Sequence, residues 1–224
     1  MSQVYAAAPI LTKEGGSPIA NNFRFKRIDN ESIEAMGEIK GFAQDHLGFI
    51  WIGSKNGLAR YDGYKIKLYQ NSDVDLHSIS TNTVNDLLVD KQGSLWVATY
   101  WGLNRYDAAL DRFERFNHDP KRAWSLSHNS VTHLHEAQDG RLWVGTEGGG
   151  LSWFDVNSHR FHHFQHHPDK AETISGNEIS SIGEEHLGRL WLGIKGLGVD
   201  IFAPTVGQVV ERLRHDPDQS TSLS

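Results

Sequence analysis

The hydrophobic residues of this chain lie in short alternating runs separated by turn residues. In the stretch from Gly48 to Gly63, apolar and polar residues alternate and the run closes on Tyr-Asp. Alternation with a period of two is typical of β-strands that bury one face, and no segment keeps a helical period. The spacing Asp45-x-x-Gly48 favours a tight hairpin in which the glycine takes a positive φ. The pattern therefore predicts a protein made of short antiparallel strands.

This strand pattern occurs four times along the chain. A Gly followed three residues later by a Trp recurs at intervals of 45, 47 and 48 residues. The glycines are Gly48, Gly93, Gly140 and Gly188, and the tryptophans are Trp51, Trp96, Trp143 and Trp191. Nine residues before each glycine, a β-branched residue starts another strand-like run: Ile39, Val84, Val131 and Ile179. Three copies introduce that run with the motif Ser-x-Asn, which begins at Ser80, Ser127 and Ser175.

Each repeat contains four strand-like segments, which we call A to D. Segment A starts at the β-branched residue, B surrounds the Trp, C ends in Tyr-Asp or its variant, and D carries two apolar residues three positions apart. The D pairs are Ile66 and Tyr69, Phe113 and Phe116, Phe161 and Phe164, and Val210 and Leu213. Four short antiparallel strands repeated at roughly 40–50 residues are the signature of a β-propeller blade. The predicted fold is all-β, with blades at residues 35–79, 80–126, 127–174 and 175–223 and the repeated Trp buried between them.

The two ends of the chain differ in their strand count. Phe25 and Ile28 show the D spacing before any A, B or C segment, which predicts an orphan outer strand at 23–34 after an N-terminal tail at 1–22. The final Ser-Leu-Ser, residues 222–224, matches the Ser-Leu-Ser at 125–127 that introduces blade three. We therefore expect a partial propeller cut from a longer one, with the starting Met in place of a removed signal sequence. Open blade faces predict self-association, by head-to-tail contact or by exchange of the orphan strand.

These motifs resemble the two-component regulator propeller repeat, whose blades carry D-x-x-G-x-[IL]-W-[IV]-G-T followed by G-L-x-R-Y-D. The first copy matches from Asp45 to Asp62 and the second from Asp90 to Asp107. The third copy ends in Trp-Phe-Asp, and the fourth lacks the Arg-Tyr-Asp end. The resemblance covers about residues 23–224. It implies the periplasmic sensing region of an inner-membrane receptor, whose output is a hybrid histidine kinase or a diguanylate cyclase.

Composition and charge restrict the partners. Lys and Arg number 22 against 28 Asp and Glu, a formal charge of −6, so nucleic acid is not expected as a partner. The chain has no Cys, which excludes disulfides and thiolate metal sites. The apolar run at residues 4–11 is too short to span a bilayer and has no Lys or Arg ahead of it. We expect no contact between this chain and a membrane.

The repeat accounts for most residues that suggest catalysis or metal binding. Three of the thirteen histidines stand at equivalent turn positions, each two residues before a proline: His118, His166 and His215. The extra His162, His163 and His167 leave metal binding as the minor alternative. The aspartates at the end of segment C are predicted to form turns: Asp62, Asp107 and Asp155. No helix is predicted after Gly148-Gly149-Gly150. Glycine-rich phosphate-binding loops lead into a helix N-terminus, so these glycines are predicted to form a turn between strands. No catalytic, metal-binding or cofactor-binding residue is predicted.

Two tryptophans fall outside the repeat, Trp101 in the B–C turn of blade two and Trp124 in the connection to blade three. Each either lines a ligand surface or packs against a neighbouring blade. The function expected from the resemblance is a non-enzymatic sensor that binds a small molecule or an oligosaccharide, associates with itself, or both. The alternative is a propeller enzyme that acts on a carbohydrate as a lyase or hydrolase, because a fold alone does not give function.

Overall fold

The structure is a computed structural model that describes residues 5–6, 26–27 and 31–216. Its described part contains four four-stranded antiparallel sheets, which confirms the predicted all-β blades. Blade one consists of β3 (Ile39–Gln44), β4 (Ile50–Ser54), β5 (Gly57–Tyr61) and β6 (Ile66–Tyr69). Blade two consists of β7 (Val84–Val89), β8 (Leu95–Thr99), β9 (Gly102–Asp107) and β10 (Arg112–Phe116). Blade three consists of β11 (Val131–Glu136), β12 (Leu142–Thr146), β13 (Leu151–Asp155) and β14 (Arg160–Phe164). Blade four consists of β15 (Ile179–Glu184), β16 (Leu190–Ile194), β17 (Gly198–Ala203) and β18 (Gln208–Leu213).

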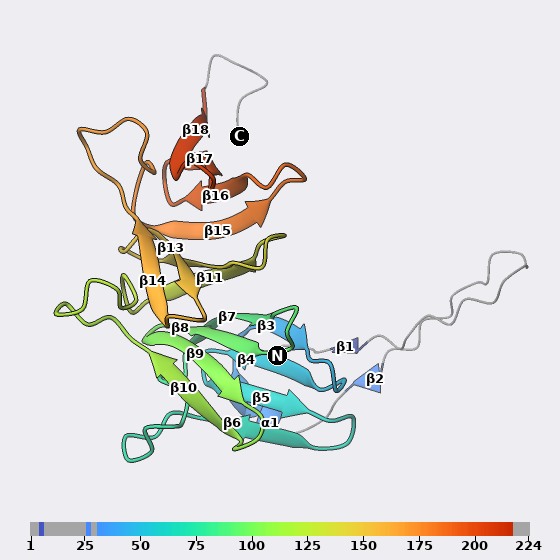
Figure 1. The fold of residues 1–224 in the computed structure, drawn as a ribbon. Coiled ribbons are helices and arrows are strands. Elements are labelled where there is room, and N and C mark those ends of the chain that lie inside the picture. Colours follow the sequence, from blue (N-terminus) through green and yellow to red (C-terminus); the bar gives the residue numbers. More distant parts are fainter. Residues whose placement is uncertain (1–4, 7–25, 28–30, 217–224) are drawn as a thin grey trace, which may run out of the picture.

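The four sheets follow one another along an arc (Figure 1). Strands pair in sequence order within each sheet, so the first strand of every blade lies at one edge and the last strand at the other. The first strands β3, β7, β11 and β15 contact one another in that order and form the inner edge of the arc. The arc does not close into a ring. All four blades therefore contribute to one continuous inner wall.

The repeated tryptophans of the first three blades lie between sheets. Trp51, Trp96 and Trp143 are at most 1% exposed. Each indole packs against an aromatic ring at the end of segment C in the next blade: Trp51 on Tyr106 at 4.7 Å, Trp96 on Phe154 at 5.5 Å and Trp143 on Phe202 at 5.9 Å between ring centroids. Fused-ring side chains supply a large apolar area for such interfaces. The prediction of a Trp buried between blades is confirmed for these three positions.

Trp191 departs from that prediction. Its side chain is 41% exposed, although it holds the same position in β16 as Trp143 holds in β12. Within the described part of the chain no fifth sheet follows blade four to cover the indole. Burial of this residue type therefore comes from the neighbouring blade rather than from its own sheet.

The acidic residue six positions before the Trp holds the indole in place. The indole Nε1 of Trp51 donates to Asp45 at 2.8 Å, and that of Trp96 donates to Asp90 at 2.8 Å. In blade three the equivalent residue is Ala137, and the buried Nε1 of Trp143 has no hydrogen-bond partner among the described residues. A buried donor without an acceptor costs stability. Blade three therefore has the buried indole ring without the hydrogen bond that blades one and two make to it.

The glycine of the motif closes the turn between the first two strands of each blade. Gly48, Gly93, Gly140 and Gly188 have φ of +87°, +86°, +84° and +76°. This conformation is accessible to glycine and strained for most other residues, which confirms the predicted hairpin geometry. In each of these turns the glycine N–H donates to the backbone oxygen three residues earlier.

The Ser-x-Asn motif ties each blade to the strand before it. The side-chain oxygens of Asn82, Asn129 and Asn177 accept backbone N–H groups at 2.6, 2.8 and 2.7 Å, just after the last strand of the preceding blade. The Ser bonds segment C of its own blade, for example Ser80 to Asn104 and Ser175 to Asp200. Asp200 is fully buried, and the guanidinium of Arg214 lies 2.6 Å away and balances its charge.

The register of the last strand differs from the prediction in blade four. Val210 was expected to fill the apolar position of segment D, but it is 52% exposed, and Val209 is the buried residue. The pairing of β17 with β18 shifts between Ile201 and Phe202, where one extra residue interrupts the ladder. A bulge reverses which side chains face the core, and sequence spacing alone does not reveal it.

The N-terminal region contains a helix where a strand was predicted. Helix α1 (Glu31–Met36) spans the end of the predicted orphan strand and the start of the predicted blade one. Its Ile33 and Met36 are buried against Ile52 and Ala59, on the face of blade one that looks away from blade two. Phe25 and Ile28, which motivated the orphan strand, lie outside the described residues. Two short strands, β1 (Tyr5–Ala6) and β2 (Lys26–Arg27), pair antiparallel with each other.

Candidate functional site

An open groove, lined mostly by polar and charged residues, runs along the inner edge of the arc, where the first strands of the blades meet. Its volume is about 330 Å³. One wall position comes from each blade, always the second residue of the inner strand: Lys40, Asn85, Thr132 and Ser180. The rim residues come from the segments that flank the inner strands: Tyr100, Ser130, Glu147, Glu178 and Lys195. We call these nine residues, together with the apolar Ile179, the axial groove.

The rim is positioned by backbone bonds between the B–C turn and the residue before segment A. The amide of Tyr100 donates to the backbone oxygen of Thr83 at 3.0 Å, and the amide of Lys195 donates to that of Glu178 at 3.0 Å. The amide of Glu147 donates in the same way to Ser130 at 2.9 Å. The first residue of each B–C turn is thereby held beside the inner strand of its own blade.

Side chains on the groove wall also join the blades to one another. The Asn85 amide donates to the backbone oxygen of Val131 at 2.7 Å, and the Thr132 hydroxyl donates to that of Ile179 at 2.6 Å. These bonds cross from blade two to blade three and from blade three to blade four. They fix the side chains, which gives the groove preformed polar atoms.

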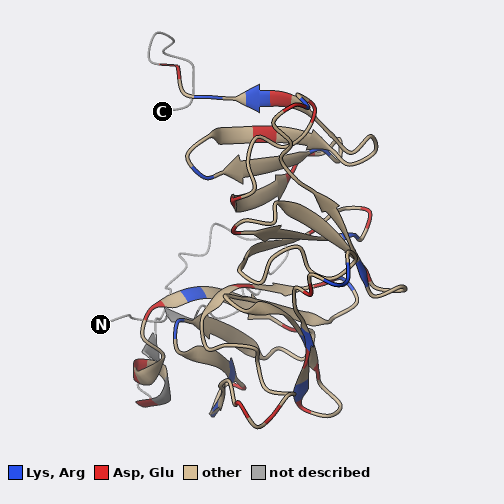
Figure 2. Ribbon diagram, turned by 90° about the vertical axis from the view of Figure 1, so that its left-hand side faces the viewer, with Lys and Arg blue, Asp and Glu red and all other residues tan. Residues whose placement is uncertain are grey.

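The charges of the rim are paired. The ammonium of Lys195 lies 2.9 Å from a carboxylate oxygen of Glu178 and 3.3 Å from one of Glu147. Hydrogen bonds first to Glu178 and then to Glu147 raise the pKa of Lys195 above its ordinary value. On blade one, Lys40 pairs with Glu38 at 2.6 Å. Figure 2 shows acidic and basic segments interspersed along all four blades, in keeping with this local pairing.

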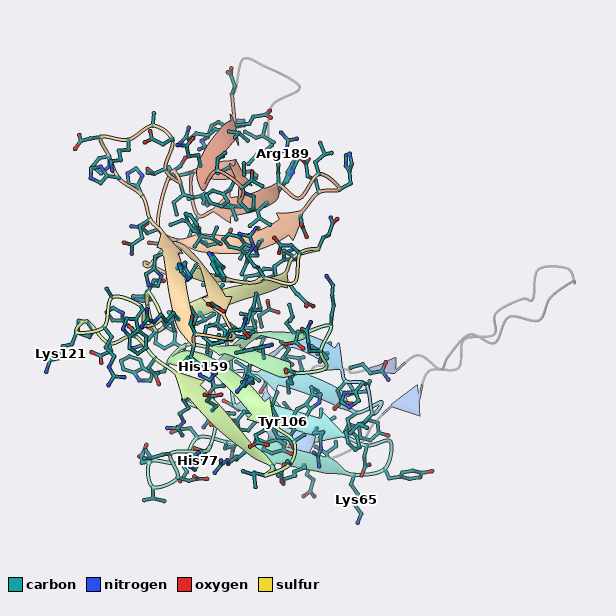
Figure 3. The ribbon with its side chains drawn as sticks, in the orientation of Figure 1. Lys65, His77, Tyr106, Lys121, His159 and Arg189 are labelled. Atoms are coloured by element: carbon teal, nitrogen blue, oxygen red, sulfur yellow. The ribbon has the colours of Figure 1, made fainter. Side chains whose placement is uncertain are left out.

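A larger cavity of about 680 Å³ lies at the outer strands of blade two, next to Tyr106 and His77 (Figure 3). Its charged lining residues are already bound to one another: Arg105 to Glu114 at 2.7 Å and Arg112 to Asp107 at 3.6 Å. Arg115 donates to backbone oxygens of the preceding loop. We interpret this cavity as a consequence of blade packing.

Asp111 holds blades one and two together beside that cavity. Its carboxylate accepts hydrogen bonds from Lys67, from the Tyr69 hydroxyl at 2.7 Å and from the Tyr106 hydroxyl at 2.6 Å. Partial burial opposes the charged form, but the bonds from Lys67, Tyr106 and Tyr69 outweigh it and lower the pKa of Asp111 to about 2. Burial in turn raises the pKa of Tyr69 and of Tyr106. In blade three the equivalent turn residue is His159, which approaches Glu114 of blade two (Figure 3).

The two tryptophans outside the repeat are both exposed, Trp101 by 56% and Trp124 by 42%. Neither lines the axial groove, but Trp101 directly follows the rim residue Tyr100, which is also 56% exposed. Two guanidinium groups lie near the Trp124 ring, that of Arg122 at 5.5 Å and that of Arg160 at 5.7 Å from the ring centroid. Trp101 remains a ligand-binding candidate because of its place next to the rim, whereas the Arg contacts of Trp124 join a loop to blade three.

Two of the histidines and all three aspartates selected from the sequence make hydrogen bonds in turns. His118 and His166 bond the backbone oxygens of Leu126 and Ile174 at 2.7 and 2.8 Å, as expected for equivalent positions. Backbone amides in the C–D turns donate to the aspartates that end segment C, Asp62, Asp107 and Asp155. His162 stacks on Trp153 at 4.2 Å. Over residues 5–6, 26–27 and 31–216, no three His, Cys, Asp or Glu side chains lie close enough together to hold a metal ion.

The polar and charged groove residues were not predicted from the sequence. They stand directly before or directly after the β-branched residue that marks segment A, or in the B–C turns. The available signal was variation between the repeats, since Lys, Asn, Thr and Ser occupy one repeat position in the four blades.

A comparison with known protein families gives a match within two of the four blades. The family described as two component regulator propeller matches residues 78–101 and 125–148, which include the B strands of blades two and three. Blades two and three thus each carry a two-component regulator propeller repeat. The match confirms the resemblance found from the Trp and Gly spacing.

A histidine kinase and a solved extracellular domain are each similar to part of the chain. Histidine kinase P4 of Formosa agariphila is 33% identical over 60 residues, which are 27% of this chain and 4% of the kinase. The extracellular domain of the putative hybrid two component system BT3049 from B. thetaiotaomicron is 26% identical with a TM-score of 0.73, over 82% of this chain and 26% of that domain. The chain is thus similar over most of its length to the extracellular domain of a putative hybrid two component system, and it spans about a quarter of that domain.

A more distant likeness concerns the fold alone. A gluconolactonase from Xanthomonas campestris, XC5397, is 18% identical with a TM-score of 0.52, over 79% of this chain and 62% of the enzyme. In the part of the chain that the structure describes, no helix has the length and apolar character needed to cross a membrane.

Proposed function

We propose that this chain is part of the sensing propeller of a bacterial membrane receptor and that it binds a small molecule or an oligosaccharide in the axial groove. The sensing region would lie in the periplasm, and the receptor would be anchored in the inner membrane with a histidine kinase or a diguanylate cyclase as output. The observation that carries the proposal is the groove itself, to which every blade contributes a different polar or charged side chain.

Binding is favoured over catalysis because the two carboxylates of the rim are engaged by the same lysine. Glu147 and Glu178 both contact Lys195, and Ser130 donates to Glu147 at 3.2 Å. A general acid or base must instead be free to exchange a proton with the substrate. A carbohydrate lyase or hydrolase therefore stays the alternative, with no residues to assign to it.

Titration calorimetry of the purified chain against a panel of small sugars and oligosaccharides tests the proposal. We expect saturable binding of at least one compound without turnover. Release of product from glycosides or polyuronides would contradict the sensor and favour the enzyme.

A second candidate role is self-association through the open face of blade four. Trp191 is 41% exposed on that face, and Phe42 is 53% exposed on the face of blade one that looks away from blade two. In the next three blades the residue equivalent to Phe42 is buried against the preceding sheet: Leu87, Leu134 and Ile182. Head-to-tail contact between two copies would cover both side chains, although α1 already covers another part of the blade-one face.

Light scattering at micromolar concentrations tests this role. We expect species larger than the 25.2 kDa monomer, and we expect Trp191→Asp to abolish them while Trp101→Asp, a matched exposed Trp, does not. A monomer at all concentrations would contradict self-association.

A further inference from the structure

Three loops of equal length lead from the last strand of one blade to the first strand of the next. They comprise residues 70–83, 117–130 and 165–178, which we call loops one, two and three. In each case one backbone oxygen of the loop accepts from a matched amide in the last strand of the blade that follows: Phe113 donates to His77 at 2.8 Å, Phe161 to Trp124 at 2.9 Å and Val209 to Glu172 at 2.8 Å. The backbone attachment of the three loops is therefore the same.

The side chain that holds each loop differs. Two positions further along the strand, loops one and three meet a guanidinium that donates to several of their backbone oxygens: Arg115 to Asp75, Ser78 and Ile79 at 3.0, 2.7 and 3.2 Å, and Arg212 to Ala171 and Thr173 at 2.5 and 2.7 Å, after the bulge in β18. For loop two the equivalent residue of β14 is His163, whose Nε2 donates to the Ala123 oxygen at 3.2 Å. Arg keeps its charge at every accessible pH, whereas an imidazole changes charge near neutrality. Loop two therefore differs from the other two in having a titratable clamp.

The hydrogen bonds of His163 fit a neutral ring. Because Nε2 donates to Ala123, the Nδ1 atom of the neutral ring accepts from the hydroxyl of Ser152, which lies 2.9 Å away and is fully buried. Among the described residues no carboxylate forms an ion pair with the ring. The acidic residue of loop two, Asp119, instead pairs with Arg122 at 3.2 Å. A protonated His163 would therefore lack a balancing negative charge.

The surroundings of His163 disfavour its charged form. Burial lowers the pKa of His163 below its ordinary value of 6.5, hydrogen bonding to the backbone of Ala123 and Ser125 opposes this shift, and the nearby His162 and His118 add to it. The exposed imidazole of an open loop therefore takes up a proton at a higher pH than the ring of the closed loop. The stabilisation that the clamp gives is present in full above the ordinary pKa and is lost as the pH falls below it.

We propose that loop two is a pH-sensitive latch, closed on blade three while His163 is neutral and released when acid protonates the ring, whereas loops one and three stay closed. The proposal goes beyond the proposed function and does not depend on the ligand of the axial groove. Loop two begins at Asn117, whose side-chain amide donates to the backbone oxygen of Trp101 at 2.7 Å, next to the rim residue Tyr100. Release of the latch therefore changes the surface beside the groove rim.

Hydrogen exchange of the three matched amides tests the latch in the full chain. The rates are measured by NMR at pH 7.5 and pH 5.0 and corrected for the intrinsic pH dependence of exchange. We expect the protection of the Phe161 amide to fall by about threefold or more at pH 5.0, because its bond to Trp124 opens with the loop. Phe113 and Val209 should keep their protection. An equal fall at all three amides, or no fall at Phe161, would overturn the proposal.

Two substitutions of His163 make the test specific. His163→Arg gives loop two the permanent cation that loops one and three have, and His163→Gln leaves a neutral donor that does not titrate. Each should remove the pH response of the Phe161 amide. If the larger Arg side chain prevents folding, His163→Gln alone decides. A response that survives in His163→Gln would assign the titration to another group and overturn the latch.

His118 provides the matched control. It bonds the Leu126 oxygen in loop two at 2.7 Å, just as His166 bonds the Ile174 oxygen in loop three at 2.8 Å. A pH response that arose at this position would therefore occur in both loops. His118→Gln should leave most of the response at Phe161, and its loss in this variant would contradict the role of His163.

Discussion

The interfaces between blades and the axial groove use the four repeats in opposite ways. At the interfaces each blade places the same residue type at the same position, as Trp51, Trp96 and Trp143 show. Along the groove the four blades place four different residues at one position. Packing against a neighbouring sheet fixes the volume and shape of a side chain, whereas a wall that faces solvent does not. In this molecule repetition therefore marks the scaffold, and variation marks the surface that is free to acquire binding chemistry.

The largest effect is expected from the buried tryptophan of blade two. Trp96→Ala should lower the free energy of unfolding by roughly 3–5 kcal/mol, as removal of a large core aromatic does. Trp191→Ala changes the same repeat position on an uncovered face and should cost less than about 1 kcal/mol. Trp101→Ala, a surface tryptophan outside the repeat, should also cost little. Urea denaturation followed by circular dichroism measures all three, and equal losses for Trp96 and Trp191 would show that the neighbouring blade does not matter.

A smaller effect is expected from the hydrogen bond that blade three lacks. Ala137→Asp places a carboxylate where Asp90 stands in blade two and should stabilise the chain by about 1 kcal/mol, because Trp143 gains an acceptor. The ammonium of Lys91, bonded to the Ala137 backbone oxygen at 2.9 Å, supplies a nearby positive charge. Asp90→Ala is the converse variant and should destabilise. If Ala137→Asp lowered the denaturation midpoint, the unpaired indole of Trp143 would not be what limits this interface.

A pH-dependent contribution of less than about 1 kcal/mol is expected from Asp111, which is 40% exposed and therefore screened. Its pKa lies at about 2 in the folded chain, below its ordinary value of 3.8. The carboxylate therefore stabilises the fold above pH 3.8, and this stabilisation is lost as the pH falls toward 2. Asparagine tolerates the positive φ at this position, so Asp111→Asn removes the titrating carboxyl group without straining the backbone. The difference in urea midpoint between the wild type and this variant should shrink from pH 5 to pH 2.5, and a constant difference would contradict the assignment.

The smallest effect on stability is expected in the groove. Lys195→Gln and Lys40→Gln should each change the free energy of unfolding by less than about 0.5 kcal/mol, since exposed ion pairs contribute little. Thermal unfolding of the two variants measures this. A large loss for either would mean that the groove belongs to the scaffold.

The sequence predicted the blades because each carries its own copy of the same packing requirement. The Gly that turns with positive φ, the Trp that fills an interface and the Asn that ties the strands recur in register. The helix over Glu31–Met36 was missed because it occurs once and lies outside the repeat pattern. Only its Ile33 and Met36 mark a buried face. Val210 was misplaced because a bulge in blade four moves the buried side chain by one residue.

The groove was missed for a related reason. The second residue of segment A gives no recurring signal, and its chemistry emerges only when four blades bring Lys40, Asn85, Thr132 and Ser180 to one wall. The pairing of Lys195 with Glu147 crosses from blade four to blade three, between residues 48 positions apart in sequence. Periodicity gives the residues that every blade shares, whereas a site depends on the ones that differ.

The most direct test of the central claim is an amide chemical-shift map of the chain during titration with the tightest-binding compound of the sugar and oligosaccharide panel. If variation among the repeats marks the ligand site, the shifts should concentrate at the inner edge, around Tyr100, Thr132, Glu178 and Lys195, and leave the interface residues Trp51, Trp96 and Trp143 unmoved. Shifts centred on the outer strands β10 and β14, with the inner edge unchanged, would contradict the account.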